Sequence, residues 1–320
     1  MAKRKERTKP RALKPGDTVA IASPASPGDA DALAKAATYL EELSLRVRFG
    51  ETFRLRRGYL AGSDEQRADE LNAMFADPGI KAILCSRGGY GTARIADRLD
   101  YELIQANPKI FWGFSDITYL HTAIRQRTGL VTFHGPMLVD LTKQPVHRLT
   151  LASFALLFST VPFRFPEEES PLDVLVEGEA AGELVGGNLA LLTSTLGTPF
   201  ELDTAGKLLL IEDIHEPPYR VDHMLNQLRL AGKLDDAAGF VVGDFSDSAP
   251  RNPEESLTLR EVWNDYLVPL GKPCMSGFSI GHCSPNVAVP LGVRAVLRTS
   301  QRELAFVEPA LLQEGGTRTG

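Results

Sequence analysis

The chain has 320 residues, of which 43% are hydrophobic and 24% are charged, as in an ordinary globular protein. This length exceeds what one hydrophobic core usually supports, so two domains are expected. The net charge is −6, although the first sixteen residues carry seven Lys or Arg and one Glu. The folded body is therefore acidic, which argues against nucleic acid as its partner.

The basic residues at the N-terminus are predicted to form a disordered tail, residues 1–16. No apolar segment follows them, because Pro10, Pro15 and Asp17 interrupt the sequence, so a secretory signal is not expected. No run approaches the roughly 18 apolar residues that are needed to span a bilayer. We therefore expect a cytoplasmic protein without a membrane partner.

The three cysteines are Cys85, Cys274 and Cys283, and their spacing matches no metal motif. An odd number of cysteines without such spacing is typical of a reducing compartment. Cys283 directly follows His282, but adjacent side chains diverge, so a packed small residue is favoured over a thiol nucleophile. Histidine pairs with metal-ligand spacing are also missing from the sequence, and neither a metal nor an organic cofactor is expected.

Strands and helices alternate through the first half of the chain, which predicts a mostly parallel sheet that binds ligands at the carboxyl ends of its strands. The expected strands are residues 17–22, 45–49, 80–85, the apolar run before Ser115, and 129–134. The expected helices are 29–43, 63–75, 92–99 and the segment that begins at Ile117.

The alternation of strands and helices stops in a segment that contains prolines and three consecutive glutamates, and it resumes after that segment. We expect an N-terminal domain over 17–150, an interdomain linker over 151–178, a C-terminal domain over 179–312 and a tail over 313–320. The C-terminal strands are expected at 181–188, 207–213, 240–244 and 274–278, followed by a hairpin of 293–298 and 303–307. The helices of this half are expected to end at 196 and to span 220–230 and 257–267.

Ser115 lies where an apolar strand passes directly into a helical pattern, in the sequence Gly113-Phe114-Ser115-Asp116. A serine on such a sharp turn is lifted above the sheet, next to backbone N–H groups that can stabilise an oxyanion. The alternative is an ordinary N-cap, because serine followed by aspartate is also preferred at the start of a helix.

A glycine-rich loop, Ser86–Gly91, follows the strand that ends at Cys85. Its spacing is not that of a dinucleotide-binding fingerprint. The loop could instead form half of an oxyanion hole. Ser115 lies one strand-helix unit later, and adjacent strands would bring the two loops together. A tight turn without function is the alternative.

Two further residues could complete a nucleophilic site. Glu212 ends a strongly apolar strand, and strand alternation lets either it or Asp213 face a cleft. His282 lies in a loop rich in turn residues. Serine needs an imidazole to take its proton, and the imidazole needs a carboxylate to fix its tautomer. Other histidines remain rivals for the base, namely His134, His215 and His223.

Six motifs in this order resemble the landmarks of the LD-carboxypeptidase family, the cytoplasmic serine peptidases of murein recycling. They are Ser86-Arg87-Gly88-Gly89-Tyr90-Gly91, Gly113-Phe114-Ser115-Asp116, His134-Gly135-Pro136-Met137, Gly186-Gly187-Asn188, Ile211-Glu212-Asp213 with Glu216-Pro217-Pro218-Tyr219-Arg220, and Gly281-His282. The resemblance covers roughly residues 17 to 310. It implies a flavodoxin-like N-terminal domain and a smaller mixed α/β C-terminal domain, paired into a homodimer.

The resemblance further implies a nucleophile at Ser115, a carboxylate at Glu212 and a base at His282. The N–H groups of Gly89 and Asp116 would form the oxyanion hole, with Gly88 as an alternative to Gly89. The implied activity is release of D-alanine from a murein tetrapeptide, at the L-centre of diaminopimelate. Two alternatives stay open: a microcin-C-type immunity peptidase that cleaves a peptidyl or aminoacyl nucleotide, and a non-catalytic two-domain peptide or sugar binding protein.

Overall fold

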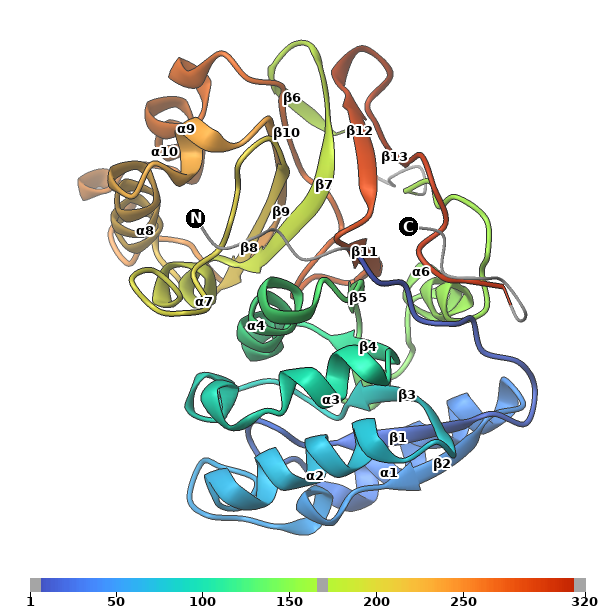
Figure 1. Cartoon of the computed structure of the whole chain (residues 1–320). Coiled ribbons are helices and arrows are strands. Elements are labelled where there is room, and N and C mark those ends of the chain that lie inside the picture. The colour runs from blue at the N-terminus through green and yellow to red at the C-terminus, as the bar shows by residue number, and fades with distance from the viewer. Residues whose placement is uncertain (1–6, 166–171, 314–320) are drawn as a thin grey trace.

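The computed structural model describes residues 7–165 and 172–313, and these residues form two sheets that are covered by helices (Figure 1). The first sheet has the strand order β11-β5-β4-β3-β1-β2, and the second has the order β13-β12-β7-β8-β9-β10-β6. The two-domain α/β architecture expected from the sequence is confirmed.

The first sheet is parallel from β2 to β5, and its order 2-1-3-4-5 is that of flavodoxin-like folds. Its strands are β1 (Thr18–Ala22), β2 (Arg46–Phe49), β3 (Ile80–Cys85), β4 (Ile110–Gly113), β5 (Thr132–His134) and the antiparallel β11 (Val289–Leu291). Its helices are α1 (Ala30–Glu42), α2 (Asp64–Ala76), α3 (Tyr101–Ala106), α4 (Thr118–Thr128), α5 (Leu138–Leu141) and α6 (Arg148–Ser153). β3 and β4 are neighbours, so the loops after them meet at one edge of the sheet.

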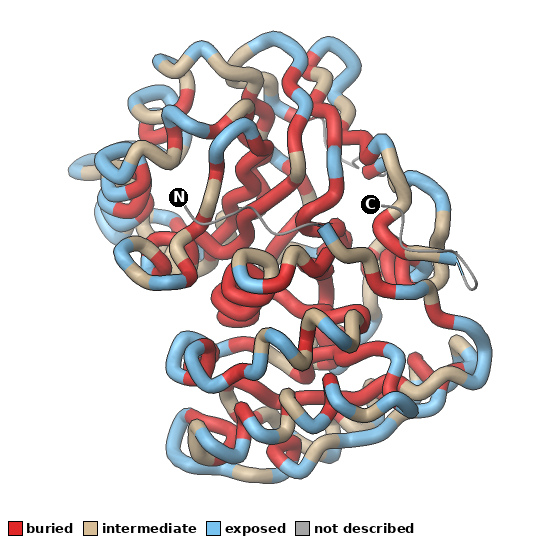
Figure 2. The backbone as a smooth tube through the Cα atoms, viewed as in Figure 1, coloured by how far each residue is buried: buried red, intermediate tan, exposed pale blue. Residues whose placement is uncertain are grey.

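The second sheet is mixed, with a parallel centre and antiparallel margins. Its strands are β6 (Asp173–Val176), β7 (Glu179–Asn188), β8 (Leu208–Ile214), β9 (Gly239–Ser246), β10 (Cys274–Ser276), β12 (Arg294–Arg298) and β13 (Glu303–Phe306). Its helices are α7 (Leu189–Ser194), α8 (Pro218–Leu230), α9 (Lys233–Asp236) and α10 (Leu259–Tyr266). The central strands of both sheets are buried, and the outer helix faces are exposed (Figure 2).

Helix α4 differs from the other helices because its first two turns are buried. Its first seven residues, 118–124, are all buried. It packs against β5 on one side and against α7 and β7 of the second domain on the other. The helix that follows Ser115 therefore lies between the two domains (Figures 1 and 2).

The expected helix over 92–99 is wrong, because the structure has two 3₁₀ turns there, Thr92–Arg94 and Ala96–Arg98. Asp116 explains part of this difference. Its carboxylate accepts a hydrogen bond from the Thr92 N–H at 2.9 Å, and its carbonyl accepts one from Thr92 Oγ1 at 2.5 Å. These contacts tie the start of the segment to the Ser115 turn, and eight residues are too few for helix propensity to prevail.

The expected domain boundaries also differ from the observed sheets. β11 lies within the expected C-terminal domain, yet it pairs with β5 of the first sheet. β6 lies within the expected linker, yet it pairs with β10 of the second sheet. Both are short strands whose partners are distant in sequence, so local patterns do not reveal them. Part of the expected linker, residues 166–171, and of the expected tail, residues 314–320, lie outside the described residues.

Residues 7–16 of the expected disordered tail pack against the folded body, while residues 1–6 lie outside the described part. Thr8 forms backbone hydrogen bonds on either side of Leu130, and the Leu13 N–H donates to the Leu157 carbonyl at 2.8 Å. The Leu13 side chain is buried in the larger core. Lys9 pairs with Glu308 at 2.7 Å. The basic residues alone predict a solvated tail. Their acidic partner, Glu308, lies about 300 positions later in the chain, so the local sequence does not reveal the contact.

We therefore expect Leu13→Ala to destabilise the protein by about 2–4 kcal/mol, through lost burial and the cavity left behind. Leu230→Ala is the matched control, because the Leu230 side chain is 72% exposed. Urea unfolding of both variants measures the difference. Equal midpoints would show that the N-terminal segment contributes nothing to the fold.

Candidate active site

Ser115 begins a 3₁₀ turn, Ser115–Ile117, that joins β4 to α4. Its φ is +62°, in the left-handed region that side chains other than Gly and Asn rarely adopt. Such a conformation costs on the order of 1–3 kcal/mol and persists only where the surrounding structure enforces it. Here the buried β4 and α4 fix both ends of the turn. The result is the strained elbow that exposes a serine at the carboxyl end of a strand.

The N-cap alternative for Ser115 is not what the structure shows. The residue preceding this turn is Phe114, and no side chain caps the turn. The Ser115 hydroxyl instead lies 3.0 Å from Nε2 of His282. A serine from the first domain and a histidine from a loop after β10 are thus in hydrogen-bond contact, 167 residues apart in sequence.

The His282 loop is held by contacts to both domains. Gly281 has a φ of +122°, and a Cβ at this position would lie 2.5 Å from Oε2 of Glu212. Only glycine therefore lets the loop approach that carboxylate. The side-chain oxygen of Asn286 accepts a hydrogen bond from the Gly281 N–H, and the backbone N–H of Asn286 donates to Thr150 Oγ1 at 2.9 Å. Thr150 lies in α6, within the first half of the chain, and no sequence motif marked it.

Glu212 lies in β8 and is fully buried. The pairing of β8 with β9 shifts register between Ile211 and Asp213, which is a local irregularity of the kind that often re-aims a side chain beside a site. Oε2 of Glu212 lies 2.8 Å from Nδ1 of His282. Because Nδ1–H donates to this carboxylate, Nε2 is left as the acceptor for the serine proton.

Asp213 faces away from His282, as strand alternation predicts for one of the two acids. Its carboxylate accepts hydrogen bonds from Asn188 Nδ2 at 2.8 Å, from the Ala190 N–H and from its neighbour Ile214 N–H. Burial, and then the charge of Glu212, raise its pKa to about 6. Asp213 thus organises the start of α7 and makes none of the contacts to the histidine.

Burial lowers the pKa of His282, but the hydrogen bond and charge of Glu212, together with the charges of Asp213 and Asp140, outweigh burial, so its pKa lies above the ordinary value of 6.5. The Phe114 ring packs against the imidazole with centroids 4.9 Å apart. The side chain of His282 keeps 14% of its surface exposed, so a reacting group can still reach it.

This raised pKa predicts a pH dependence. A base must be neutral to take the serine proton, so kcat/KM is expected to fall with decreasing pH as His282 becomes protonated. Because the pKa is raised, the fall should begin above the pH at which an ordinary histidine titrates. A pH profile of kcat/KM measures it. A rate that stays constant well below pH 6.5 would contradict the role of His282 as base.

The glycine-rich loop approaches the same turn. A Cβ at Gly88 would lie 2.9 Å from Cβ of Ser115 and 3.2 Å from the Asp116 nitrogen. A Cβ at Gly89, whose φ is +112°, would collide with Ser26. Both positions therefore need glycine. The Asp116 carboxylate is turned away, toward Thr92. The backbone of this loop and the Asp116 N–H thus border the serine from one side.

None of the three rival histidines contacts Ser115. His134 is fully buried, and burial lowers its pKa well below the ordinary value. The side chain of His215 is 69% exposed and lies 3.8 Å from Asp247. His223 lies on the exposed face of α8.

Within 7–165 and 172–313, no cluster of three or more His, Cys, Asp or Glu residues could hold a metal ion. Cys85 and Cys274 are buried, and burial raises the pKa of both thiols, that of Cys274 to about 12. Neither thiol is therefore an ionised nucleophile. Over the same described ranges, no helix is both long enough and apolar enough to cross a membrane.

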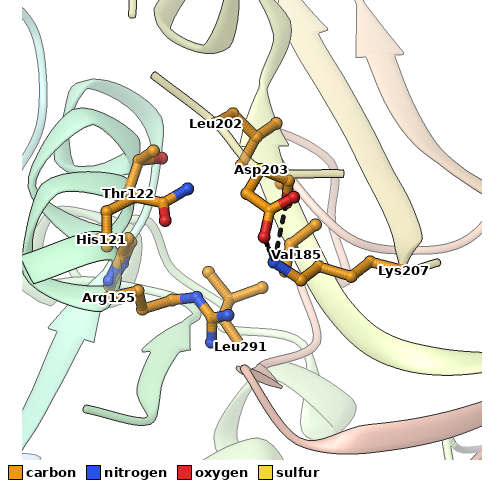
Figure 3. A pocket seen from close by; sticks show the side chains of 10 residues that line it. His121, Thr122, Arg125, Val185, Leu202, Asp203, Lys207 and Leu291 are labelled. Carbon is orange, nitrogen blue, oxygen red and sulfur yellow. Dashed lines mark hydrogen bonds and ion pairs between the residues drawn. The ribbon is translucent and has the colours of Figure 1, made fainter. Parts of the chain in front are cut away.

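The two halves of the site are held together by contacts of α4. Thr118 Oγ1, three residues after Ser115, accepts a hydrogen bond from the Asn188 N–H at 3.0 Å. A Cβ at Gly187 would lie 2.7 Å from the same oxygen, so glycine permits this close approach. One helical turn further, a small cavity of about 10 Å³ lies between α4 and the second domain (Figure 3). Lys207 and Asp203 pair at its far wall.

A strained serine, a histidine and a buried carboxylate in one hydrogen-bonded chain define a serine-hydrolase type of site, here built across two α/β domains. The family model described as "LD-carboxypeptidase N-terminal domain" matches residues 19–135, and "LD-carboxypeptidase C-terminal domain" matches residues 181–297. The chain belongs to the LD-carboxypeptidase family, as its sequence motifs indicated.

Three relatives illustrate the family. The chain is 55% identical to the "Probable murein peptide carboxypeptidase" of Bacillus subtilis, over 97% of both chains. It is 33% identical to the "Murein tetrapeptide carboxypeptidase" of Pseudomonas aeruginosa, over 87% of this chain and 92% of the relative. The solved muramoyltetrapeptide carboxypeptidase of Oxalobacter formigenes is 29% identical with a TM-score of 0.80, over 90% of this chain and 97% of that one.

Proposed function

We propose that the protein is a serine carboxypeptidase that hydrolyses the L,D-peptide bond of murein tetrapeptides and releases the terminal D-alanine. The single observation that carries this proposal is the hydrogen-bonded chain from Glu212 through His282 to Ser115, in a member of this family. The names of the relatives from Bacillus subtilis and Pseudomonas aeruginosa support the substrate class.

In the first step, Ser115 Oγ attacks the carbonyl carbon of the scissile bond while His282 Nε2 takes the hydroxyl proton. Glu212 holds the imidazole and stabilises the positive charge that forms on it. The carbonyl oxygen becomes an oxyanion, for which the N–H groups of Gly89 and Asp116 are the proposed donors, with Gly88 as the alternative to Gly89. A Cβ at Gly88 would lie 3.0 Å from Ser115 Oγ and 3.2 Å from the Asp116 nitrogen, which supports a donor from this glycine-rich loop beside the Asp116 N–H.

The carbon–nitrogen bond then breaks, and His282 gives its proton to the amine of the departing D-alanine. An acyl-enzyme on Ser115 remains. In the second step, water loses a proton to His282 and attacks the ester carbonyl, and the proton returns to Ser115 Oγ as the tripeptide acid leaves. No metal or organic cofactor enters this sequence.

A microcin-C-type immunity peptidase is the nearest alternative, and it would use the same nucleophile on a nucleotide-linked substrate. The 55% identity to a protein named for murein peptides favours the first assignment. A non-catalytic binding protein would have no need of a strained serine in contact with a histidine.

The proposed function places the enzyme in the cytoplasm, where murein fragments are recycled. We also propose a homodimer without nucleic acid or membrane partners. The family resemblance supports the dimer, and the acidic net charge of −6 supports the absence of nucleic acid. Sedimentation of the purified protein at several concentrations tests the oligomeric state.

The test of function is incubation of purified protein with the tetrapeptide L-Ala-γ-D-Glu-meso-diaminopimelate-D-Ala. Free D-alanine and the tripeptide are expected in equal amounts, and mass spectrometry together with a D-amino acid assay measures them. An aminoacyl sulfamoyl nucleotide serves as the competing substrate. Cleavage of the nucleotide compound alone would transfer the assignment to the immunity peptidases.

A further inference from the structure

A cleft of about 1040 Å³ lies at the carboxyl ends of β8 and β9. The mechanism proposed above gives this cleft no role. Its lining includes the turn after β8, the first turn of α8 and the loop after β9. α8 lies beside α7, which in turn packs on the buried α4 (Figure 1). The cleft therefore lies beyond the carboxyl end of β8, the strand that carries Glu212.

The lining of this cleft contains a preformed ion pair of opposite charges. Arg220 Nε donates to Oε2 of Glu216 at 2.6 Å. Pro217 and Pro218, at the start of α8, restrict the backbone between the two side chains. The side chain of Glu216 is 18% exposed and that of Arg220 is 56% exposed, so both charges can be reached from the cleft.

This pair lies on the segment that follows Glu212 in the chain. Glu216 follows Glu212 by four residues, which places their Cα atoms no more than about 14 Å apart. A substrate group that binds there must therefore extend several bonds beyond the scissile carbonyl.

The charge pattern of the cleft decides what kind of group fits. Four acidic and two basic side chains line it, namely Glu216, Asp222, Asp247 and Glu255 with Arg220 and Arg251. A phosphate would meet more repulsion than attraction in such a lining. A zwitterionic group would find a partner for each of its charges.

The proposed substrate carries such a group. Three methylene groups beyond the L-centre at which the bond is cut, diaminopimelate has a second amino acid centre with one ammonium and one carboxylate. We propose that Glu216 and Arg220 form the subsite for this distal zwitterion, with Glu216 accepting from the ammonium and Arg220 donating to the carboxylate. This inference rests on the proposed function. It assigns recognition of the distal zwitterion of diaminopimelate to the second domain.

The test compares two tetrapeptides that differ at the third residue. One carries meso-diaminopimelate, and the other carries L-lysine, which keeps the distal ammonium but lacks the carboxylate. The wild-type protein is expected to prefer the diaminopimelate peptide by about tenfold or more in kcat/KM, because a charge-assisted contact is lost with lysine. Arg220→Met should bring the ratio of the two kcat/KM values close to one.

Glu216→Gln is the second variant, and it should lower kcat/KM for both peptides, because both carry the ammonium. The matched control is Arg229→Met at the other end of α8, where the exposed guanidinium bonds only to Asn226 among the contacts described. This control should keep the wild-type ratio.

Two outcomes would overturn the inference in different ways. Equal kcat/KM values for the two peptides, unchanged in Arg220→Met, would remove the subsite and leave D-alanine release intact. If neither peptide yields D-alanine, the proposed function fails and the subsite fails with it.

Discussion

Ser115→Ala is expected to lower kcat by about 10⁴-fold or more, because the variant has no nucleophile to form the acyl-enzyme. Substrate affinity should change little, since the hydroxyl contributes to bond formation and not to the shape of the cleft. Stopped assays of D-alanine release measure the rate, and calorimetric titration of the variant with tetrapeptide measures binding.

The control for this experiment is Ser194→Ala. Ser194 is an exposed serine whose hydroxyl donates to the Leu191 carbonyl of its own helix, so its removal should leave the rate unchanged. Circular dichroism should show that both variants are folded. A Ser115→Ala protein with wild-type kcat would exclude the acyl-enzyme mechanism, and a binding protein would become the better assignment.

Much of this site could be predicted because each of its parts leaves a local mark in the sequence. An apolar strand that passes into a helix at Gly-Phe-Ser-Asp predicts an elbow, although it cannot separate an elbow from an N-cap. The φ of +62° at Ser115 and its contact with His282 distinguish the two. Likewise, alternation shows that Glu212 and Asp213 face opposite sides, but the sequence alone does not say which of them meets a histidine.

The features that the sequence did not reveal depend on contacts between distant segments. β11 joins the first sheet through β5, more than 150 positions earlier in the chain. The composition of residues 7–16 predicts a solvated basic tail. In the structure, Lys9 pairs with Glu308 and the Leu13 side chain is buried in the core. Thr150 anchors the His282 loop through Asn286, yet it is an ordinary threonine on a short helix. Neither periodicity nor motif spacing contains this information.

The comparison of Glu212→Gln with Asp213→Asn tests which acid orients the histidine. Glutamine keeps an oxygen that can accept from His282 Nδ1, but it removes the negative charge that stabilises the imidazolium. We expect kcat to fall on the order of 10³-fold in this variant. Asp213→Asn should cost about tenfold or less, because Asp213 contacts Asn188 and backbone N–H groups and does not touch the imidazole.

The pH profile separates an electrostatic effect of Glu212 from a structural one. The charge and hydrogen bond of Glu212 raise the pKa of His282, so Glu212→Gln should move the acid limb of the residual activity to lower pH. Asp213 contributes less to this pKa, so Asp213→Asn should move the limb less. Equal losses of kcat with equal shifts in the two variants would contradict the assignment of Glu212, and a reversed order would transfer the role to Asp213.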